Sequence, residues 1–261
     1  MTIKEKFQQL KKEGRKAFIA YVPFGFPSIK QTKNILLILQ EAGVDIIEVG
    51  IPFSDPIADG PIIQEAATMA LRKGATTEKL FCTLKELKNR IKVPLILMSY
   101  YNPVFKFGVD RFFKKMKDSG LCGILTVDLP IDESSEYLKK AKKFGLETIL
   151  FVTPVTPKAR AQRIVRASSG FIYYISVTGI TGPRDISYAS LAKHIQELKT
   201  LTNLPICVGF GIHTKEQVEK VWRFSDGAIM GSAVVKFIKD NYPKRNFSLR
   251  FKKYLRSLCM K

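Results

Sequence analysis

The stretch Glu48-Val-Gly-Ile-Pro-Phe-Ser-Asp-Pro-Ile-Ala-Asp-Gly-Pro61 runs from a buried strand into a loop punctuated by proline and glycine. The segment from Val44 to Ile51 is apolar on both alternating faces, which is typical of a parallel strand covered on both sides. A charged side chain there costs several kcal/mol of folding free energy unless it is paired or used. Glu48 is such a side chain, and the loop that follows presents Asp55 and Asp59. Two carboxylates at the end of one strand form a candidate acid–base pair.

The length and composition of the chain suit one large domain. It has 261 residues, of which 46% are apolar, and a closed α/β barrel takes roughly 250 residues. No linker rich in serine and glycine marks a boundary, so we expect one domain over residues 1–261. The four cysteines show no C-x-x-C spacing, and only two histidines occur. We therefore expect reduced thiols in a cytoplasmic protein and no metal site.

The net charge of the chain is +20, which would suit nucleic acid, a membrane surface or a phosphorylated substrate. No aromatic residue is interleaved with a basic stripe, so a solvated lysine-rich surface is the favoured interpretation, and we expect neither a nucleic-acid nor a membrane partner. No apolar run approaches the length of a membrane span. The tail Lys244–Lys261 carries seven basic residues and no acidic one. Its apolar residues recur at helical spacing, which predicts a final helix docked on the body, with a membrane-surface helix as the alternative.

Short apolar runs alternate with longer amphipathic ones along the chain. The eight candidate strands are Ala17–Val22, Val44–Val49, Pro94–Ser99, Cys122–Val127, Glu147–Phe151, Phe171–Ile175, Pro205–Gly209 and Gly227–Met230. The helical patterns between them include Gln31–Ala42, Asp110–Ser119, Ser134–Phe144, Lys158–Ala167, Tyr188–Thr200 and Lys215–Trp222. Eight strand–helix units predict an α/β fold, a single (β/α)8 TIM barrel with an additional N-terminal helix and a basic C-terminal helix. A doubly wound sheet is the alternative.

In such a barrel, catalytic residues lie at the carboxyl ends of the strands and in the loops that follow. Side chains alternate along a strand, so Ile46, Glu48 and Gly50 share one face. If Ile46 points inward, Glu48 does too, with Asp59 in the loop above it. A structural carboxylate held by backbone donors is the alternative for Glu48. We favour catalysis, because structural acids are rarely placed deep in a barrel strand without a nearby cation.

Glycine-rich turns follow the last strands of the predicted barrel. One turn reads Gly209-Phe210-Gly211-Ile212, and another reads Gly231-Ser232-Ala233 before an apolar helical pattern. Glycine lets a backbone approach a ligand closely, and the free amides of a helix N-terminus suit a phosphate. Because phosphates commonly bind between these two loops of a barrel, we expect a phosphate site here, with ordinary tight turns as the alternative. A third glycine-rich loop, Gly179–Arg184, is a candidate lid.

At this point the chain closely resembles the α subunits of tryptophan synthase over nearly its whole length. The resemblance rests on Pro52-Phe-Ser-Asp-Pro-Ile-Ala-Asp-Gly-Pro61 with Ile63 and Gln64, Tyr101-Asn102-Pro103 with Phe105, Asp128-Leu129-Pro130, Gly179-Ile-Thr-Gly182, Gly209-Phe-Gly-Ile212 and Gly231-Ser-Ala233. The first of these motifs is long and highly specific. Two positions depart from the family pattern: Tyr21 stands where the family often has Phe, and Phe26 stands where it usually has Asp before Pro.

The resemblance implies a lyase that cleaves indole-3-glycerol phosphate to indole and glyceraldehyde 3-phosphate by retro-aldol chemistry. It gives Glu48 the role of proton shuttle between the glycerol hydroxyl and indole C3. It gives Asp59 the role of binding the indole N–H and stabilising the cationic indolenine, and it places Tyr173 near Glu48. The implied contacts to the indole ring and glycerol chain come from Tyr21, Ile63, Met98, Val127 and Phe210. Those to the phosphate come from the amides around Gly182, Gly211, Gly231 and Ser232.

The resemblance also implies a partner, the β subunit of an α2β2 tetramer, to which indole passes through a tunnel. The resemblance further implies that the loops after the second and sixth strands communicate between the sites of the two subunits, and that the partner interface and these loops include Pro52, Asp55, Pro56 and Thr181. Pyridoxal phosphate belongs to the β subunit, so we expect no cofactor in this chain.

Three other functions stay open. The chain is alternatively an interaction protein that activates a β subunit and has little chemistry of its own. It is alternatively another phosphate-sugar barrel enzyme, such as an indole-glycerol-phosphate synthase or a phosphoribosylanthranilate isomerase, although these lack the Pro52–Pro61 motif. A nucleic-acid binder is supported only by the charge.

Overall fold

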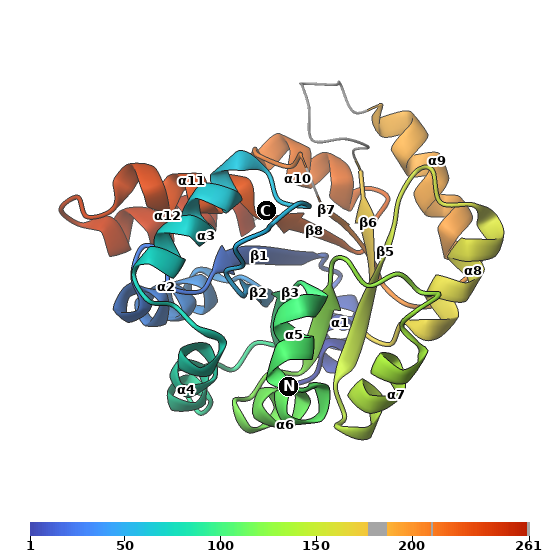
Figure 1. Ribbon diagram of the computed structural model, residues 1–261. Coiled ribbons are helices and arrows are strands. Elements are labelled where there is room, and N and C mark those ends of the chain that lie inside the picture. The colour runs from blue at the N-terminus through green and yellow to red at the C-terminus, as the bar shows by residue number, and fades with distance from the viewer. Residues whose placement is uncertain (177–186, 210, 260–261) are drawn as a thin grey trace.

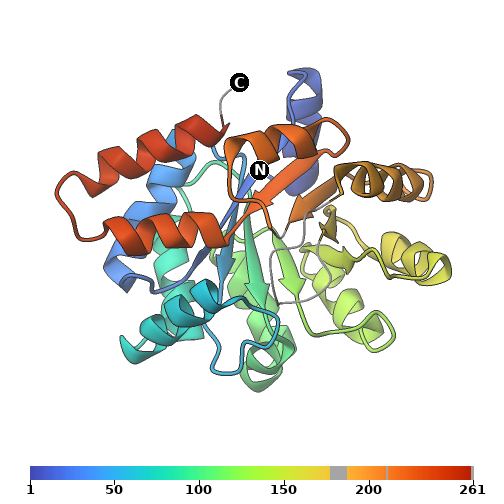
Figure 2. The same cartoon turned by 90° about the horizontal axis from the view of Figure 1, so that it is seen from above.

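Eight parallel strands close into a barrel in the order β1 to β8, and the helices form a ring around it (Figures 1 and 2). The computed structural model describes residues 1–176, 187–209 and 211–259. The strands are β1 (Ala17–Pro23), β2 (Ile46–Gly50), β3 (Leu95–Ser99), β4 (Gly123–Thr126), β5 (Glu147–Val152), β6 (Ile172–Ile175), β7 (Ile206–Gly209) and β8 (Gly227–Met230). The predicted barrel is confirmed, and the doubly wound alternative is wrong because β8 pairs with β1.

Twelve helices occur in the described ranges. They are α1 (Ile3–Lys12), α2 (Ile29–Ala42), α3 (Pro61–Arg72), α4 (Thr77–Leu87), α5 (Tyr101–Phe107), α6 (Val109–Asp118), α7 (Ser135–Lys143), α8 (Lys158–Ala167), α9 (Tyr188–Lys199), α10 (Lys215–Trp222), α11 (Ser232–Asn241) and α12 (Phe247–Cys259). The six helical patterns named from the sequence and both additional terminal helices are confirmed. The structure adds α3, α4 and α5, and it begins β2 at Ile46 rather than at the predicted Val44.

The inside of the barrel is an apolar cluster of its own, separate from the layer between strands and helices. Its members include Ile19, Ile46, Ile96, Leu125, Ile149, Phe171, Tyr173, Cys207 and Ile229. Side chains at intervening strand positions, such as Ile47 and Val49, pack in the outer layer instead. Because side chains alternate along a strand, Glu48 shares the inward face of Ile46. The predicted direction of Glu48 is therefore confirmed.

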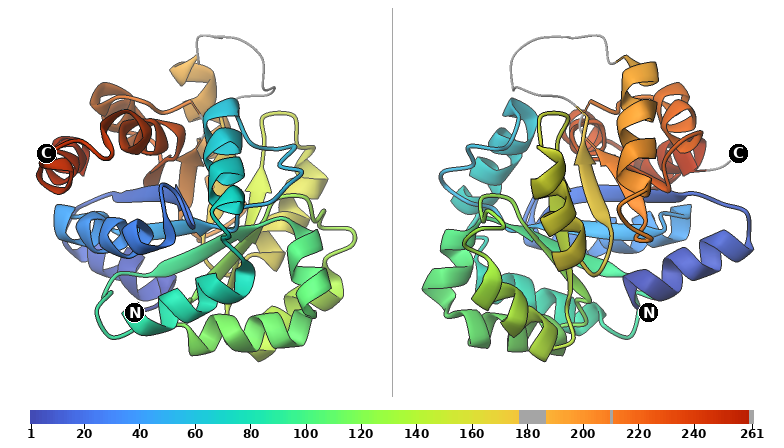
Figure 3. Two further views of the ribbon diagram at one scale, coloured as in Figure 1. Left: turned by 60° about the vertical axis from the view of Figure 1, so that its left-hand side comes forward. Right: turned by 90° about the vertical axis from the view of Figure 1, so that its right-hand side faces the viewer.

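Helix α1 closes the end of the barrel at which the strands begin, opposite α3 (Figure 3). Ile3 is fully buried in the interior cluster. A Cβ atom at Gly123 or Gly170 would lie only 2.8 or 2.9 Å from Ile3 Cδ1, so these glycines make room for this side chain. The Glu147 carboxylate, at the start of β5, accepts hydrogen bonds from the amides of Ile3 and Lys4 at 2.7 and 3.1 Å. These bonds satisfy free donors at the N-terminus of α1. Because α1 and Ile3 close this end of the barrel, a ligand must approach from the other rim.

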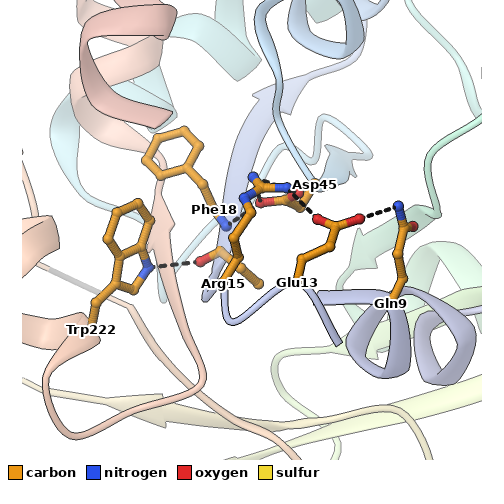
Figure 4. A network of polar contacts seen from close by, with 7 residues as sticks. Gln9, Glu13, Arg15, Phe18, Asp45 and Trp222 are labelled. Atoms are coloured by element: carbon orange, nitrogen blue, oxygen red, sulfur yellow. Dashed lines mark hydrogen bonds and ion pairs between the residues drawn. The ribbon is translucent and has the colours of Figure 1, made fainter. Parts of the chain in front are cut away.

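A polar network at the same end ties β1 to its neighbours (Figure 4). The Asp45 carboxylate, before β2, accepts a hydrogen bond from the Phe18 amide at 2.9 Å and one from the Arg15 guanidinium at 3.3 Å. Burial raises the pKa of Asp45 above its ordinary value, although both partners oppose that effect. Trp222 of α10 donates from Nε1 to the Ala17 carbonyl at 2.9 Å, as a buried indole requires. These contacts fix the ends of the strands that carry the site described below.

The basic final helix α12 docks on the body of the protein as predicted. Phe251 and Leu255 are fully buried, and Tyr254 stacks on Phe237 of α11 with ring centroids 4.3 Å apart. Lys252 forms an ion pair with Glu41 of α2 at 2.8 Å. The apolar face of α12 is thus occupied by the barrel's own helices, so the membrane-surface alternative is wrong. Within the described ranges, no helix combines the length and the apolar character needed to cross a bilayer.

Candidate active site

Glu48 lies inside the barrel, close to the rim at which the strands end. Its register partners on the two neighbouring strands are Tyr21 of β1 and Ile96 of β3. Only 1% of its surface is exposed, and its Oε2 atom has no hydrogen-bond partner within the described part of the chain. Within the described residues, no backbone donor reaches the Oε2 atom, so the structure gives no support at this atom to a carboxylate held by backbone donors. A buried carboxyl group with an unpartnered oxygen is costly when ionised, so the fold favours its protonated form.

The burial of Glu48 and the nearby Asp59 determine the ionisation of its carboxyl group. Burial, and after it the negative charge of Asp59, raise the pKa of Glu48 from 4.5 to about 8. At neutral pH the side chain is therefore mostly protonated. A protonated carboxyl group facing a barrel mouth is suited to act as a general acid near pH 7, because its pKa is close to the operating pH.

Asp59 reaches the same space from the loop between β2 and α3. It is 7% exposed, and burial raises its pKa from 3.8 to about 6, against a hydrogen bond from the Tyr100 hydroxyl that lowers it. The same hydroxyl oxygen accepts a hydrogen bond from the Ala58 amide at 2.9 Å. Tyr100, which follows β3, thus holds the loop and its carboxylate over the barrel. Two interacting carboxyl groups with separated pKa values can take different roles, one as acid and one as anion.

Two tyrosines flank the carboxyl pair, and each leans over a glycine of the next strand. A Cβ atom at Gly50 of β2 would lie 2.2 Å from the Tyr21 hydroxyl, and one at Gly209 of β7 would lie 2.3 Å from the Tyr173 hydroxyl. Any other residue at these two glycines would push the rings away. Both tyrosines interact electrostatically with Glu48 and Asp59, and burial raises the pKa of each phenol well above 10. Both phenols therefore stay protonated and can donate hydrogen bonds.

Met98, Val127 and Ile63, which are also predicted to contact the indole ring and glycerol chain, lie around the mouth. Met98 follows Ile96 on the inward face of β3 and packs on the interior cluster. Val127 follows β4, and its amide donates to the Ser99 carbonyl at 3.0 Å. Ile63, on the first turn of α3, lies 3.7 Å from the position of a Cβ atom at Gly231. The structure thus brings Ile63 beside the last barrel strand. Phe210 lies outside the described residues.

The segments after β7 and β8 carry three of the residues predicted to bind a phosphate, Gly211, Gly231 and Ser232. Gly211 has a φ of 74°, a conformation that favours glycine. Helix α11 begins at Ser232, with Gly231 as its N-cap residue, and no side chain caps it. The first turn of this helix contains no acidic residue, so its amides and positive dipole end suit an anion. Gly182 and the candidate lid Gly179–Arg184 lie outside the described residues.

The loop between β2 and α3 forms part of the rim. Pro52 is buried, Pro56 is half-buried and Asp55 is exposed, while the neighbouring Ile57 is 74% exposed. Two other exposed apolar side chains lie on the connections after β3 and β5: Phe105, 65% exposed, and Val155, 74% exposed. Exposed apolar side chains on one rim are a common mark of an interaction surface. Thr181 lies outside the described residues.

Sequence reasoning missed Tyr100 and the two glycines beneath the tyrosines. Tyr100 had one usable signal, its position directly after a predicted strand. The roles of Gly50 and Gly209 depend on the register between neighbouring strands, which no local pattern gives. In the described ranges, no cluster of three or more His, Cys, Asp or Glu side chains could hold a metal ion.

Comparisons with known proteins agree with this geometry. The family model described as "Tryptophan synthase alpha chain" matches residues 7–258. The tryptophan synthase alpha chain of Petrotoga mobilis is 41% identical over 244 residues, which cover 93% of this chain and 95% of that protein. The one from a Thermoanaerobacter species is 41% identical over 256 residues, covering 98% and 97%. The crystal structure of tryptophan synthase subunit alpha from Legionella pneumophila superposes with a TM-score of 0.91 at 30% identity, over 99% of this chain and 97% of that one.

The raised pKa of Glu48 predicts a pH dependence of stability. Below about pH 4.5 the carboxyl group is protonated in both states; between pH 4.5 and 8 it ionises only in the unfolded state, so the free energy of unfolding falls as pH rises. We expect the wild-type protein to lose roughly 3 kcal/mol relative to Glu48→Gln between pH 5 and pH 8. Urea unfolding of both proteins at the two pH values measures the difference. Parallel pH dependence of the two proteins would contradict the buried, protonated state.

Proposed function

The chain belongs to the family of tryptophan synthase alpha chains, and from this membership we propose that Glu48, Asp59 and Tyr173 form its catalytic group. Members of the family are carbon–carbon lyases of tryptophan biosynthesis, which cleave indole-3-glycerol phosphate to indole and glyceraldehyde 3-phosphate. The observation that carries the proposal is the pair of buried carboxyl groups with separated pKa values, about 8 for Glu48 and about 6 for Asp59.

The proposed chemistry needs one proton to move from oxygen to carbon. Glu48 delivers its proton to indole C3, which converts the ring to a cationic indolenine. The bond between C3 and the glycerol chain then breaks, its electrons return to the ring, and the hydroxyl on the cleaved carbon gives its proton to Glu48 as the aldehyde forms. Glu48 ends in its starting state, and no water or cofactor is consumed. A carboxyl group that is mostly protonated at pH 7 suits the first step.

Asp59 is proposed to accept a hydrogen bond from the indole N–H and to stabilise the positive charge of the indolenine. Its pKa of about 6 leaves it mostly ionised at neutral pH, as that role requires. Its loop is held by Tyr100 through the Ala58 amide. Tyr173 is proposed to orient Glu48 and the substrate, since its phenol stays protonated and interacts with that carboxyl group.

We place the phosphate of the substrate at the amides around Gly182, Gly211, Gly231 and Ser232. The support is the uncapped N-terminus of α11 and the positive φ of Gly211. The indole ring and glycerol chain would then lie between this end and the carboxyl pair. The proposed packing contacts come from Tyr21, Ile63, Met98, Val127 and Phe210.

Tryptophan synthase alpha chains partner with a β subunit, and we propose that this chain does so in an α2β2 tetramer. The proposed contact is the rim that carries Pro52, Asp55, Pro56 and Thr181, together with the exposed Ile57. The other exposed apolar side chains of that rim, Phe105 and Val155, support a partner there. Pyridoxal phosphate is assigned to the β subunit and no cofactor to this chain. A cytoplasmic location completes the proposal, since all four cysteines are free.

The first test of the proposal is the substitution Glu48→Gln, which keeps the shape of the side chain and removes its proton-transfer capacity. We expect indole release from indole-3-glycerol phosphate to fall roughly 10²- to 10⁴-fold, with KM changed much less. Steady-state kinetics with and without a tryptophan synthase β subunit measures the effect, and β should raise the wild-type rate.

The matched control is Glu147→Gln, the same change at the closed end of the barrel, which should leave indole release unchanged. Near-normal turnover by Glu48→Gln would remove Glu48 from the mechanism. If the wild-type chain releases no indole under either condition but alters β activity, it acts as an activator and not as a lyase.

The phosphate site is tested by Gly231→Asp. A Cβ atom at this position meets only ordinary contacts, at 3.5 Å from Tyr21, and Asp is a favourable N-cap residue, so the fold should persist. Its charge beside the bound phosphate should raise KM roughly 10- to 100-fold. Gly231→Asn, which has the same shape without the charge, is the control. Equal KM values for the Asp and Asn variants would show that no anion binds at this helix end.

A further inference from the structure

Tyr21 connects the two ends of the site. Its ring begins at the phosphate end, because a Cβ atom at Gly231 would lie 3.5 Å from both Tyr21 Cβ and Tyr21 Cδ1. Its hydroxyl ends at the carboxyl end, over Gly50 of β2. Gly50 is two residues beyond Glu48 and shares its inward face. A substrate that reaches from the phosphate end to Glu48 therefore passes along the Tyr21 side chain.

Two polar side chains lie near each other at this point. Tyr21 is buried, with 6% of its surface exposed, and its phenol interacts electrostatically with the carboxyl groups of Asp59 and Glu48. The Oε2 atom of Glu48 has no hydrogen-bond partner within the described chain. Tyr21 and Glu48 are register partners on adjacent parallel strands, whose backbones lie about 4.8 Å apart. Buried polar atoms are nearly always hydrogen-bonded in proteins, so the Oε2 atom of Glu48, with the Tyr21 phenol near it, calls for a polar group of the ligand.

The chemistry of the two groups defines that polar group. The Tyr21 phenol is kept protonated by burial and by the carboxyl pair, so it can donate as well as accept. Glu48, mostly protonated at neutral pH, presents both a donor and an acceptor. An aliphatic hydroxyl, which donates one bond and accepts others, fits between them. The indole ring carries only an N–H donor, and the phosphate belongs at the helix end.

We propose that the Tyr21 hydroxyl, together with Glu48, binds a hydroxyl group of the substrate's glycerol chain, so that Tyr21 selects for a hydroxylated chain rather than only packing against the ring. This inference rests on the proposed function, because it takes indole-3-glycerol phosphate as the ligand. It gives Tyr21 a polar role in the site and explains why Gly50, which makes room for the phenol, carries no side chain.

The test compares two ligands that differ only in the hydroxyls of the chain: indole-3-glycerol phosphate and 3-(indol-3-yl)propyl phosphate. Tyr21→Phe removes one oxygen atom and keeps the ring. We expect kcat/KM for indole-3-glycerol phosphate to fall roughly 3- to 10-fold, the size of one neutral hydrogen bond. The Kd of the propyl phosphate, measured by calorimetry, should change less than about twofold, because it has no hydroxyl for the phenol to bind. Tyr254→Phe on α12 makes the same change outside the site and should alter neither value.

If Tyr21→Phe lowers kcat/KM for indole-3-glycerol phosphate and the affinity for the propyl phosphate by the same factor, the inference is overturned, because Tyr21 would then act only through packing or on the phosphate. An unchanged kcat/KM in Tyr21→Phe would overturn it as well. If Tyr21→Phe unfolds at the same temperature as the wild-type protein, any loss of kcat/KM or affinity is local to the site. Failure of the proposed function looks different: the wild-type protein itself would release no indole, whereas the comparison of the two ligands by calorimetry would still report on the Tyr21 hydroxyl.

Discussion

The removal of Glu48 from water is the constraint on which the rest of the site depends. A carboxyl group inside a closed barrel, 1% exposed and beside a second carboxyl group, holds its proton to a pKa of about 8. The same burial lowers stability at neutral pH, since the unfolded chain ionises and the folded chain does not. A stability cost placed at one inward position of a barrel strand is typical of a functional site. The neighbouring groups are arranged around that position.

The fold closes the barrel below Glu48 and places polar groups around it at the opposite rim. Helix α1 inserts Ile3 beneath Gly123 and Gly170 and closes the lower end of the barrel. At the upper rim, strand register gives Tyr21 and Tyr173 a glycine each to lean over. Both phenols interact electrostatically with the carboxyl pair. Backbone glycines thus determine how close the polar groups of the site can approach one another.

Much of this arrangement follows from local sequence patterns. Alternation of strand and helix patterns gives the barrel, and the two-residue period of β2 gives the inward direction of Glu48 from that of Ile46. The start of α11 at Ser232 follows from glycine and the apolar pattern after it. The hydrogen bond between Tyr100 and Asp59 could not be predicted, since it joins two loops that only the closed barrel brings together. The same holds for the glycine beneath each tyrosine, because a register between strands is a tertiary property.

The protonation of Glu48 can be measured directly. Carbon-13 labelling of the glutamate side chains, with Glu48→Gln to identify the resonance, allows the carboxyl chemical shift of Glu48 to be followed from pH 4 to pH 9. The account predicts a midpoint near 8, well above the ordinary value of 4.5. A midpoint near 4.5 would mean that Glu48 is ionised at neutral pH, and it could then not be the proton donor to indole C3.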